Sequence, residues 1–108
     1  MKTKIALLSV FIAATSAAYA ASASENWENS CASCHGADGK AQTKQGKKLK
    51  IRDYTDPAVQ AVLKDEAMIK ATAEGVMEGD KQRMKGYKDE YSEAEIKDLV
   101  AFIRALKP

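Results

Sequence analysis

The stretch that decides the fold is Cys31-Ala32-Ser33-Cys34-His35, in the N-terminal third of a chain of 108 residues. It holds both cysteines and the single histidine of the sequence. Cys31 and Cys34 are three residues apart, nearly one helical turn, so their thiols can face the same side. His35 follows directly and brings an imidazole to the same place. The motif therefore indicates a binding site for a cofactor or a metal.

Cys-x-x-Cys-His is the attachment signature of c-type haem. The spacing lets both thiols reach the two vinyl groups along one edge of the porphyrin. His35 can then bind the iron from the same side as the proximal axial ligand. We predict one covalent haem c, attached through Cys31 and Cys34.

Three other interpretations of the motif are weighed against haem. A thioredoxin-like redox pair is typical of a strand and helix pattern, which this sequence lacks. A structural zinc site needs four ligands of the cysteine or histidine kind, and the chain has three. A disulfide between residues three apart closes too small a loop to add much stability. The pattern favours haem over all three.

Residues 1–20 have the pattern of a secretory signal peptide. Lys2 and Lys4 form a positively charged start, and residues 5–14 are almost wholly apolar. This apolar run is about half the ~20 residues that span a bilayer, so an uncleaved anchor is the weaker alternative. We expect export to the periplasm and no membrane span after cleavage. Export agrees with the motif, because c-type haem is attached outside the cytoplasm.

The cleavage site is predicted after Ala20, where Ala18-Tyr19-Ala20 supplies small residues, and Ala23 is the alternative. Residues 21–108 then form one small domain. The whole chain carries 17 Lys and Arg against 15 Asp and Glu, and removing residues 1–20 takes away two lysines. The mature net charge is therefore zero, which gives no reason to expect nucleic-acid binding.

The fold class is predicted to be all-α, because no strand-like alternation of useful length is present. Two long polar segments, residues 36–51 and 76–91, are predicted to be loops. The predicted helices cover about residues 23–33, 56–63 and 65–74, and a last helix follows Ser92.

The last helix has the clearest pattern. Ser92-Glu93-Ala94-Glu95 is a capping box, and Tyr91 is placed to form a hydrophobic staple with Ile96. The apolar residues that follow recur at helical spacing: Ile96, Leu99, Val100, Ile103 and Leu106.

On these features residues 21–108 resemble a small class I cytochrome c. The resemblance implies three to four short helices around one covalent haem, with the first and last helices crossing. It also implies that Trp27 packs near Phe102 at that crossing. Ala23 stands where the family usually has a glycine, so the crossing is expected to be slightly looser.

The same resemblance implies a methionine as the second axial ligand, in a loop before the last helix. Family members have Met-Pro-x-aromatic there, and this chain has Met84-Lys85-Gly86-Tyr87. Met84 is therefore the predicted ligand beside His35. Met77 or an open site are the alternatives, and Met68 is expected to have a core role rather than to bind the iron. Without the proline, the loop is expected to be more mobile.

A class I cytochrome c is a one-electron carrier, so the resemblance implies electron transfer between a periplasmic donor and acceptor without substrate turnover. Iron bound by both His35 and Met84 leaves no position for a substrate. Two alternatives stay open. One is a haem enzyme or a gas or peroxide sensor with an open sixth position, and the other is a subunit permanently docked on a haem enzyme.

The expected surface of this monomer carries two groups of basic residues on loops near the haem. They are Lys40, Lys44, Lys47, Lys48 and Lys50 in one loop, and Lys81, Arg83, Lys85 and Lys88 in the other. Such a charge distribution can steer the haem edge toward an acidic partner. Arg52 and Tyr54 lie where family members often contact the haem propionates.

Overall fold

The computed structural model describes residues 18–108, with side chains from residue 23 onward. The predicted signal peptide lies outside the described residues except for its last three, with which α1 (Ala18–Ser30) begins. The leader and its cleavage site stay predictions. Within the described residues, no helix has the length and apolar character needed to cross a membrane.

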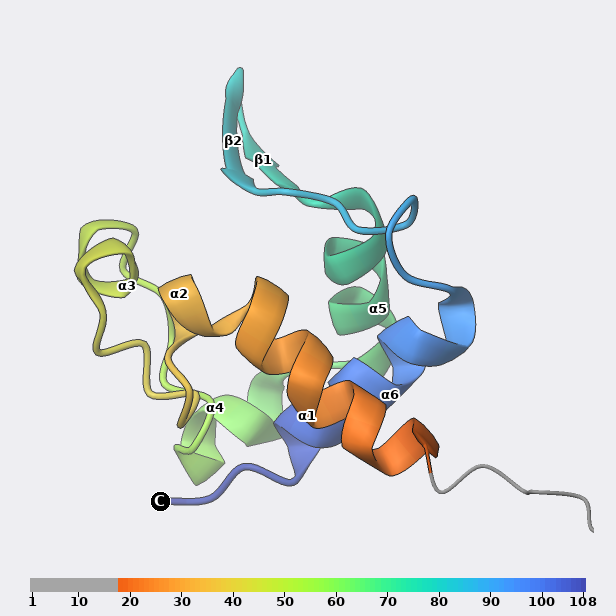
Figure 1. Cartoon of the computed structure of the whole chain (residues 1–108). Helices are drawn as coiled ribbons and strands as arrows, with labels where there is room; N and C mark the ends of the chain where they lie inside the picture. The colour runs from red at the N-terminus through yellow and green to blue at the C-terminus, as the bar shows by residue number, and fades with distance from the viewer. Residues whose placement is uncertain (1–17) are drawn as a thin grey trace, which may run out of the picture.

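Across residues 18–108 the chain forms six helices and one two-stranded antiparallel sheet (Figure 1). After α1 the elements are α2 (Ala32–His35), α3 (Lys44–Lys48), α4 (Pro57–Val62), α5 (Asp65–Glu74), β1 (Val76–Glu78), β2 (Lys81–Met84) and α6 (Glu93–Arg104). The helix predicted over residues 23–33 is two helices, because the chain bends at Cys31. The mostly helical fold class is confirmed.

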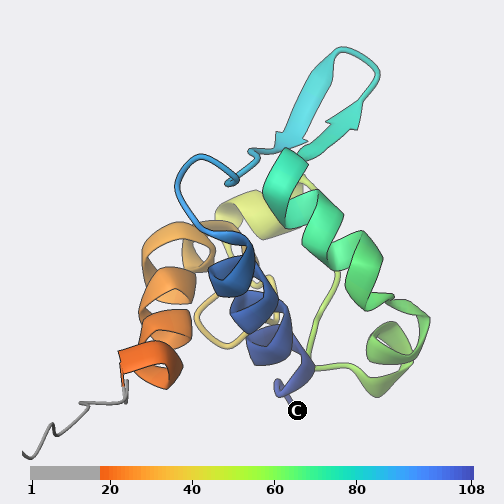
Figure 2. The same ribbon diagram turned by 90° about the vertical axis from the view of Figure 1, so that its right-hand side faces the viewer.

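The first and last helices cross, as the resemblance implied (Figures 1 and 2). Trp27 on α1 is 2% exposed, and its ring centroid lies 5.3 Å from that of Phe102 on α6. Ala23, one helical turn earlier, is also buried. The small residue and the aromatic pair therefore lie at the helix crossing.

The core is built on the apolar face of α6. Ile96, Leu99, Val100 and Ile103 are all buried, in agreement with their helical spacing. The capping box is present, because Ser92 Oγ accepts from the backbone N–H of Glu95 and the Glu95 carboxylate accepts from the backbone N–H of Ser92. Local sequence signals thus fix where this helix begins.

The two middle helices also begin and end where the sequence predicts. The Asp56 side chain accepts from the N–H of Ala58, and Pro57 occupies the first helical position of α4. Gly75, with a φ of +83°, ends α5. Arg104 on α6 bonds Asp65 and the carbonyls of Gln60 and Leu63, and so ties both helices to the last one.

The prediction that residues 36–51 are only a loop is wrong over α3. Thr43 Oγ1 caps this helix by accepting from the N–H of Gly46, and it also donates to the carbonyl of Cys34. A Cβ atom on Gly46 would lie 2.2 Å from the Ala41 carbonyl oxygen. The helix therefore depends on close tertiary packing against the cysteine motif.

The prediction that residues 76–91 are a loop without strands is wrong at β1 and β2, which pair as an antiparallel hairpin. Gly79 stands at the turn with a φ of +59°, as the first position of a two-residue hairpin turn requires. The hairpin projects from the helical body (Figure 1) and ends at Met84. It delivers that methionine to the cavity described next.

Candidate functional site

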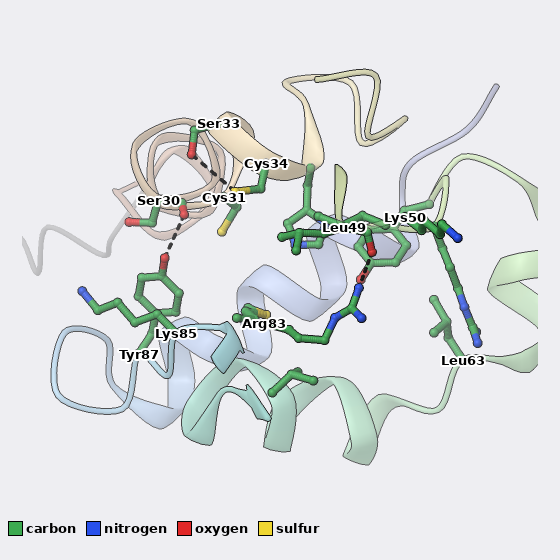
Figure 3. A pocket seen from close by; sticks show the side chains of 16 residues that line it. Ser30, Cys31, Ser33, Cys34, Leu49, Lys50, Leu63, Arg83, Lys85 and Tyr87 are labelled. Carbon is green, nitrogen blue, oxygen red and sulfur yellow. Dashed lines mark hydrogen bonds between the residues drawn. The ribbon is translucent and has the colours of Figure 1, made fainter. Parts of the chain in front are cut away.

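A cavity of about 540 Å³ opens beside the cysteine motif. Most of its lining comes from three segments: the motif with the end of α1, the chain that follows α3, and the end of β2 with the loop after it. Leu63 and Val76 complete the lining. Figure 3 shows Cys31 and Cys34 on one wall, with Arg83 and Tyr87 on the opposite wall.

Both thiols belong to this cavity, and no disulfide joins them. The bend after α1 leaves Cys31 buried, with its N–H bonded to the Trp27 carbonyl and its carbonyl to the His35 N–H. Burial, and secondarily the nearby Cys34, raises the pKa of the Cys31 thiol to about 11. A redox pair of the thioredoxin kind uses a thiol whose pKa is lowered, so this environment disfavours that interpretation.

The zinc interpretation finds no support either. Among residues 18–108, no group of three or more His, Cys, Asp and Glu side chains is placed to hold a metal ion.

His35 packs against two aromatic rings. Its ring centroid lies 5.2 Å from that of Tyr54, with nearly parallel planes, and 5.6 Å from that of Trp27. Burial lowers the pKa of His35, which favours the neutral imidazole that binds metals. Its Nδ1 atom is buried without a hydrogen-bond partner in the described structure.

These features fit a haem. His35 lines the cavity, and burial favours its neutral imidazole, the form that binds iron. Two unpaired thiols share its cavity, and the cavity is large. Cys31 and Cys34 would hold the porphyrin covalently, and His35 would bind its iron.

Neighbouring residues hold His35 and its aromatic partners in place. The Trp27 indole Nε1 donates to the carbonyl of Gly36, directly after the histidine, over 3.0 Å. Tyr54 donates its backbone N–H to Gly39 and accepts at its carbonyl from Gln60 Nε2. The Trp27 ring and the backbone of Tyr54 are therefore held by hydrogen bonds.

The three methionines of the described region occupy different environments. Met84 is half-buried and lines the same cavity as Cys31, Cys34 and His35. Met77 lies on the hairpin with 58% of its surface exposed. Met68 is buried in the hydrophobic core, which fits the core role expected for it, and it also lines a small cavity of about 50 Å³ that Met84 and His35 border.

The sequence of residues 20–107 matches the family model for cytochrome c. The chain belongs to the cytochrome c family. Its cofactor is accordingly haem c, attached through Cys31 and Cys34. Members of this family generally serve in electron transfer.

Two solved structures are similar over most of the chain. The KustC0563 c-type cytochrome is 30% identical with a TM-score of 0.70, and the match covers 80% of this chain and 98% of that one. A tyrosine-to-phenylalanine mutant of Kustc0563 is 30% identical with a TM-score of 0.67, over 80% of this chain and 99% of that one. A comparison with curated proteins gave no match.

The loop after Met84, expected to be mobile in this cytochrome c, is fastened to the helices. The backbone N–H groups of Tyr87 and Lys88 donate to carbonyls at the end of α5, and the Tyr87 hydroxyl donates to the carbonyl of Ser30 on α1. A Cβ atom on Gly86 would lie 2.6 Å from the carbonyl carbon of Glu74. Backbone packing thus supplies restraint where the family's proline is missing.

The rim of the cavity is basic, with Lys50, Arg52, Arg83 and Lys85 among its lining residues. Arg52 and Tyr54 do lie at the cavity, and their contact with the haem propionates stays a prediction. Burial raises the pKa of Tyr54, and Arg52 opposes this shift.

Sequence reasoning missed one part of the site, the contact of Arg83 across the cavity. Its guanidinium donates to the backbone carbonyl of Leu49 (Figure 3). It also pairs with Glu78. Leu49 lies 34 positions earlier in the chain. No local pattern signals a bond over that separation.

Proposed function

We propose that this protein is an exported one-electron carrier whose haem iron is bound by His35 and Met84. The observation that carries the proposal is the position of Met84, which lines the same cavity as His35 and both cysteines. Met77 is exposed and Met68 belongs to the core, so neither is as well placed as Met84 to bind the iron.

Each residue of the site would have its own role in electron transfer. Haem supplies the ferric and ferrous couple. His35 and Met84 would both hold the iron, and no position on it would remain for a substrate. The thioether of Met84 is a soft ligand that favours the ferrous form, and would raise the reduction potential relative to two histidines. Trp27 and Leu99, each 2% exposed, keep water from the core side of the site.

Covalent haem and export are tested together by expressing the full-length chain and fractionating the cells. We expect a haem-staining band after denaturing electrophoresis of the periplasmic fraction, and its loss in the Cys31→Ala/Cys34→Ala variant. Stain that stays in the cytoplasm would contradict export, and stain that is lost from the wild type on denaturation would contradict covalent attachment.

The alternative function, an enzyme or sensor with an open sixth position, predicts different ligand binding. A carrier with Met84 on the iron should bind carbon monoxide slowly in the reduced state, because the methionine must leave first. Rapid binding by the reduced wild type, monitored by stopped-flow absorption, would favour the open site and contradict the carrier.

We further propose that the basic rim guides an acidic redox partner to the cavity. Charges on a rim act over about 10 Å at 0.1 M salt, so oxidation by an anionic reagent should slow as salt is added. The probe is hexacyanoferrate(III), monitored by stopped-flow absorption of the reduced protein.

Two double variants with equal charge change locate the effect. Lys50→Gln/Arg52→Gln alters the rim, and Lys64→Gln/Lys70→Gln alters exposed lysines on and before α5. The rim variant should lose more of the salt dependence than the α5 variant. Equal loss in both would show that only net charge matters and would overturn the proposed rim.

A further inference from the structure

The hairpin and the chain after α3 face each other across the mouth of the cavity. Arg83 lies on β2, directly before Met84, and its guanidinium reaches the backbone carbonyl of Leu49 on the opposite side. Figure 3 shows this bond spanning the pocket. A second nitrogen of the same guanidinium pairs with Glu78 on β1. One side chain therefore links both strands of the hairpin to the facing wall.

This link restrains the strand before Met84, which is not bonded to the helices in the part of the chain that the structure describes. The loop after Met84 is bonded to α5 and to α1 through Tyr87 and Lys88. The strand before Met84 belongs to a hairpin that projects from the helical body (Figure 1). Arg83 fastens that strand to the Leu49 segment, so the methionine is held from both directions.

The chemistry of arginine suits this role. Its planar fork can donate to two acceptors at once, here a carboxylate and a carbonyl, and it stays charged at all ordinary pH values. The position after Met84 is Lys85, so the loop lacks the fixed φ that a proline would give.

We propose that Arg83 is a positioning residue that keeps Met84 at the haem iron by tying β2 to the Leu49 carbonyl. This inference rests on the proposed function, because it takes Met84 as the axial ligand. An external ligand can bind the iron only when Met84 has left it, so its apparent affinity rises with the open fraction of the loop. Losing a partly exposed charge-assisted bond should raise that fraction about fivefold.

The test is a titration of the oxidised holoprotein with imidazole, monitored by the methionine-to-iron charge-transfer band. Wild type is compared with Arg83→Gln and with Lys81→Gln, which removes the same charge from an exposed residue of the same strand. We expect Arg83→Gln to bind imidazole about fivefold more tightly than wild type, and Lys81→Gln to stay within twofold.

Two other results would overturn the inference in distinguishable ways. If wild type shows the band and the two variants bind imidazole equally, Arg83 acts only as a charge, and the proposed function survives alone. If wild type shows no such band, there is no Met84 bond to protect, and the proposed function fails together with the inference.

Discussion

At the scale of single residues, Trp27 connects the helix crossing with the haem site. Its ring meets Phe102 on α6 and His35 in the motif, and its indole N–H bonds the carbonyl of Gly36. Gly36 is itself buried, and its carbonyl accepts both from this indole and from the backbone N–H of Gly39. A single side chain thus contributes both to the packing of the terminal helices and to the backbone beside His35.

Replacing Trp27 by phenylalanine keeps an aromatic ring and removes the donor. We expect the free energy of unfolding of the holoprotein to fall by about 0.5–1.5 kcal/mol, the net contribution of one hydrogen bond, because the Gly36 carbonyl keeps its bond from the Gly39 N–H. Urea unfolding measures it. Phe102→Leu is the control, because it alters the ring contact and keeps the bond to Gly36. An unfolding free energy unchanged in Trp27→Phe would show that this bond contributes nothing.

At the scale of elements, the capping box of α6 gives a prediction for pH. Hydrogen bonds from the backbone N–H and side chain of Ser92, with a smaller contribution from Asn26, lower the pKa of Glu95 in the folded protein. A lowered pKa means that the ionised carboxylate stabilises the fold. That stabilisation is present above the ordinary value of about 4.3 and is lost as the pH falls through the lower folded value.

Glu95→Gln keeps an acceptor for the cap and removes the titration. We expect the variant to be less stable than wild type at pH 7 and the difference to shrink as the pH falls below about 4. The urea midpoint of the holoprotein is followed as a function of pH. Glu93→Gln, in the same helical turn, serves as the comparison. A gap between wild type and Glu95→Gln that stays constant down to pH 3 would exclude a role for the Glu95 charge.

How far each element could be predicted depends on where its stabilisation comes from. Capping residues and apolar spacing predict α4, α5 and α6, because both patterns involve only a few neighbouring residues. The helix α3 has Gly46 in its middle, which lowers helix propensity, and it forms by packing against Cys34. The hairpin did carry a signal in Gly79-Asp80, but its strands are short and rich in charged residues.

At the scale of the whole molecule, the protein is built around its cavity. The cavity takes about 540 Å³ from the interior of a chain of 108 residues, and small domains bury only a modest core. The cysteine motif, the chain after α3 and the hairpin with its following loop meet at this space. The haem should therefore supply much of the core that the folded state needs.

The variant Cys31→Ala/Cys34→Ala, purified without covalent haem, tests this dependence. We expect a broad, weakly cooperative urea transition and loss of the near-ultraviolet circular dichroism of Trp27, because the core lacks its central group. The holoprotein carrying Met84→Ala keeps the covalent haem and should unfold cooperatively. If the haem-free variant unfolds as sharply as the holoprotein and at the same urea concentration, the polypeptide core suffices alone.

The sequence predicted the part of the site that is contiguous in the chain, and not the contacts that form between distant segments. The motif of residues 31–35 is contiguous, so the covalent haem follows from spacing alone. Met84 lies 49 positions after His35, and only the resemblance to a family singled it out. The bond from Arg83 to Leu49 joins two segments that meet only in the folded chain, and it had to be seen in three dimensions.

The most direct test of the account is the methionine-to-iron charge-transfer band in the absorption spectrum of the oxidised holoprotein. Wild type and two variants are compared: Met84→Ala removes the proposed ligand, and Met77→Ala removes the exposed methionine of the same hairpin. We expect the band in wild type and in Met77→Ala, and its loss in Met84→Ala. A band that persists in Met84→Ala, or that wild type lacks, would contradict ligation by Met84.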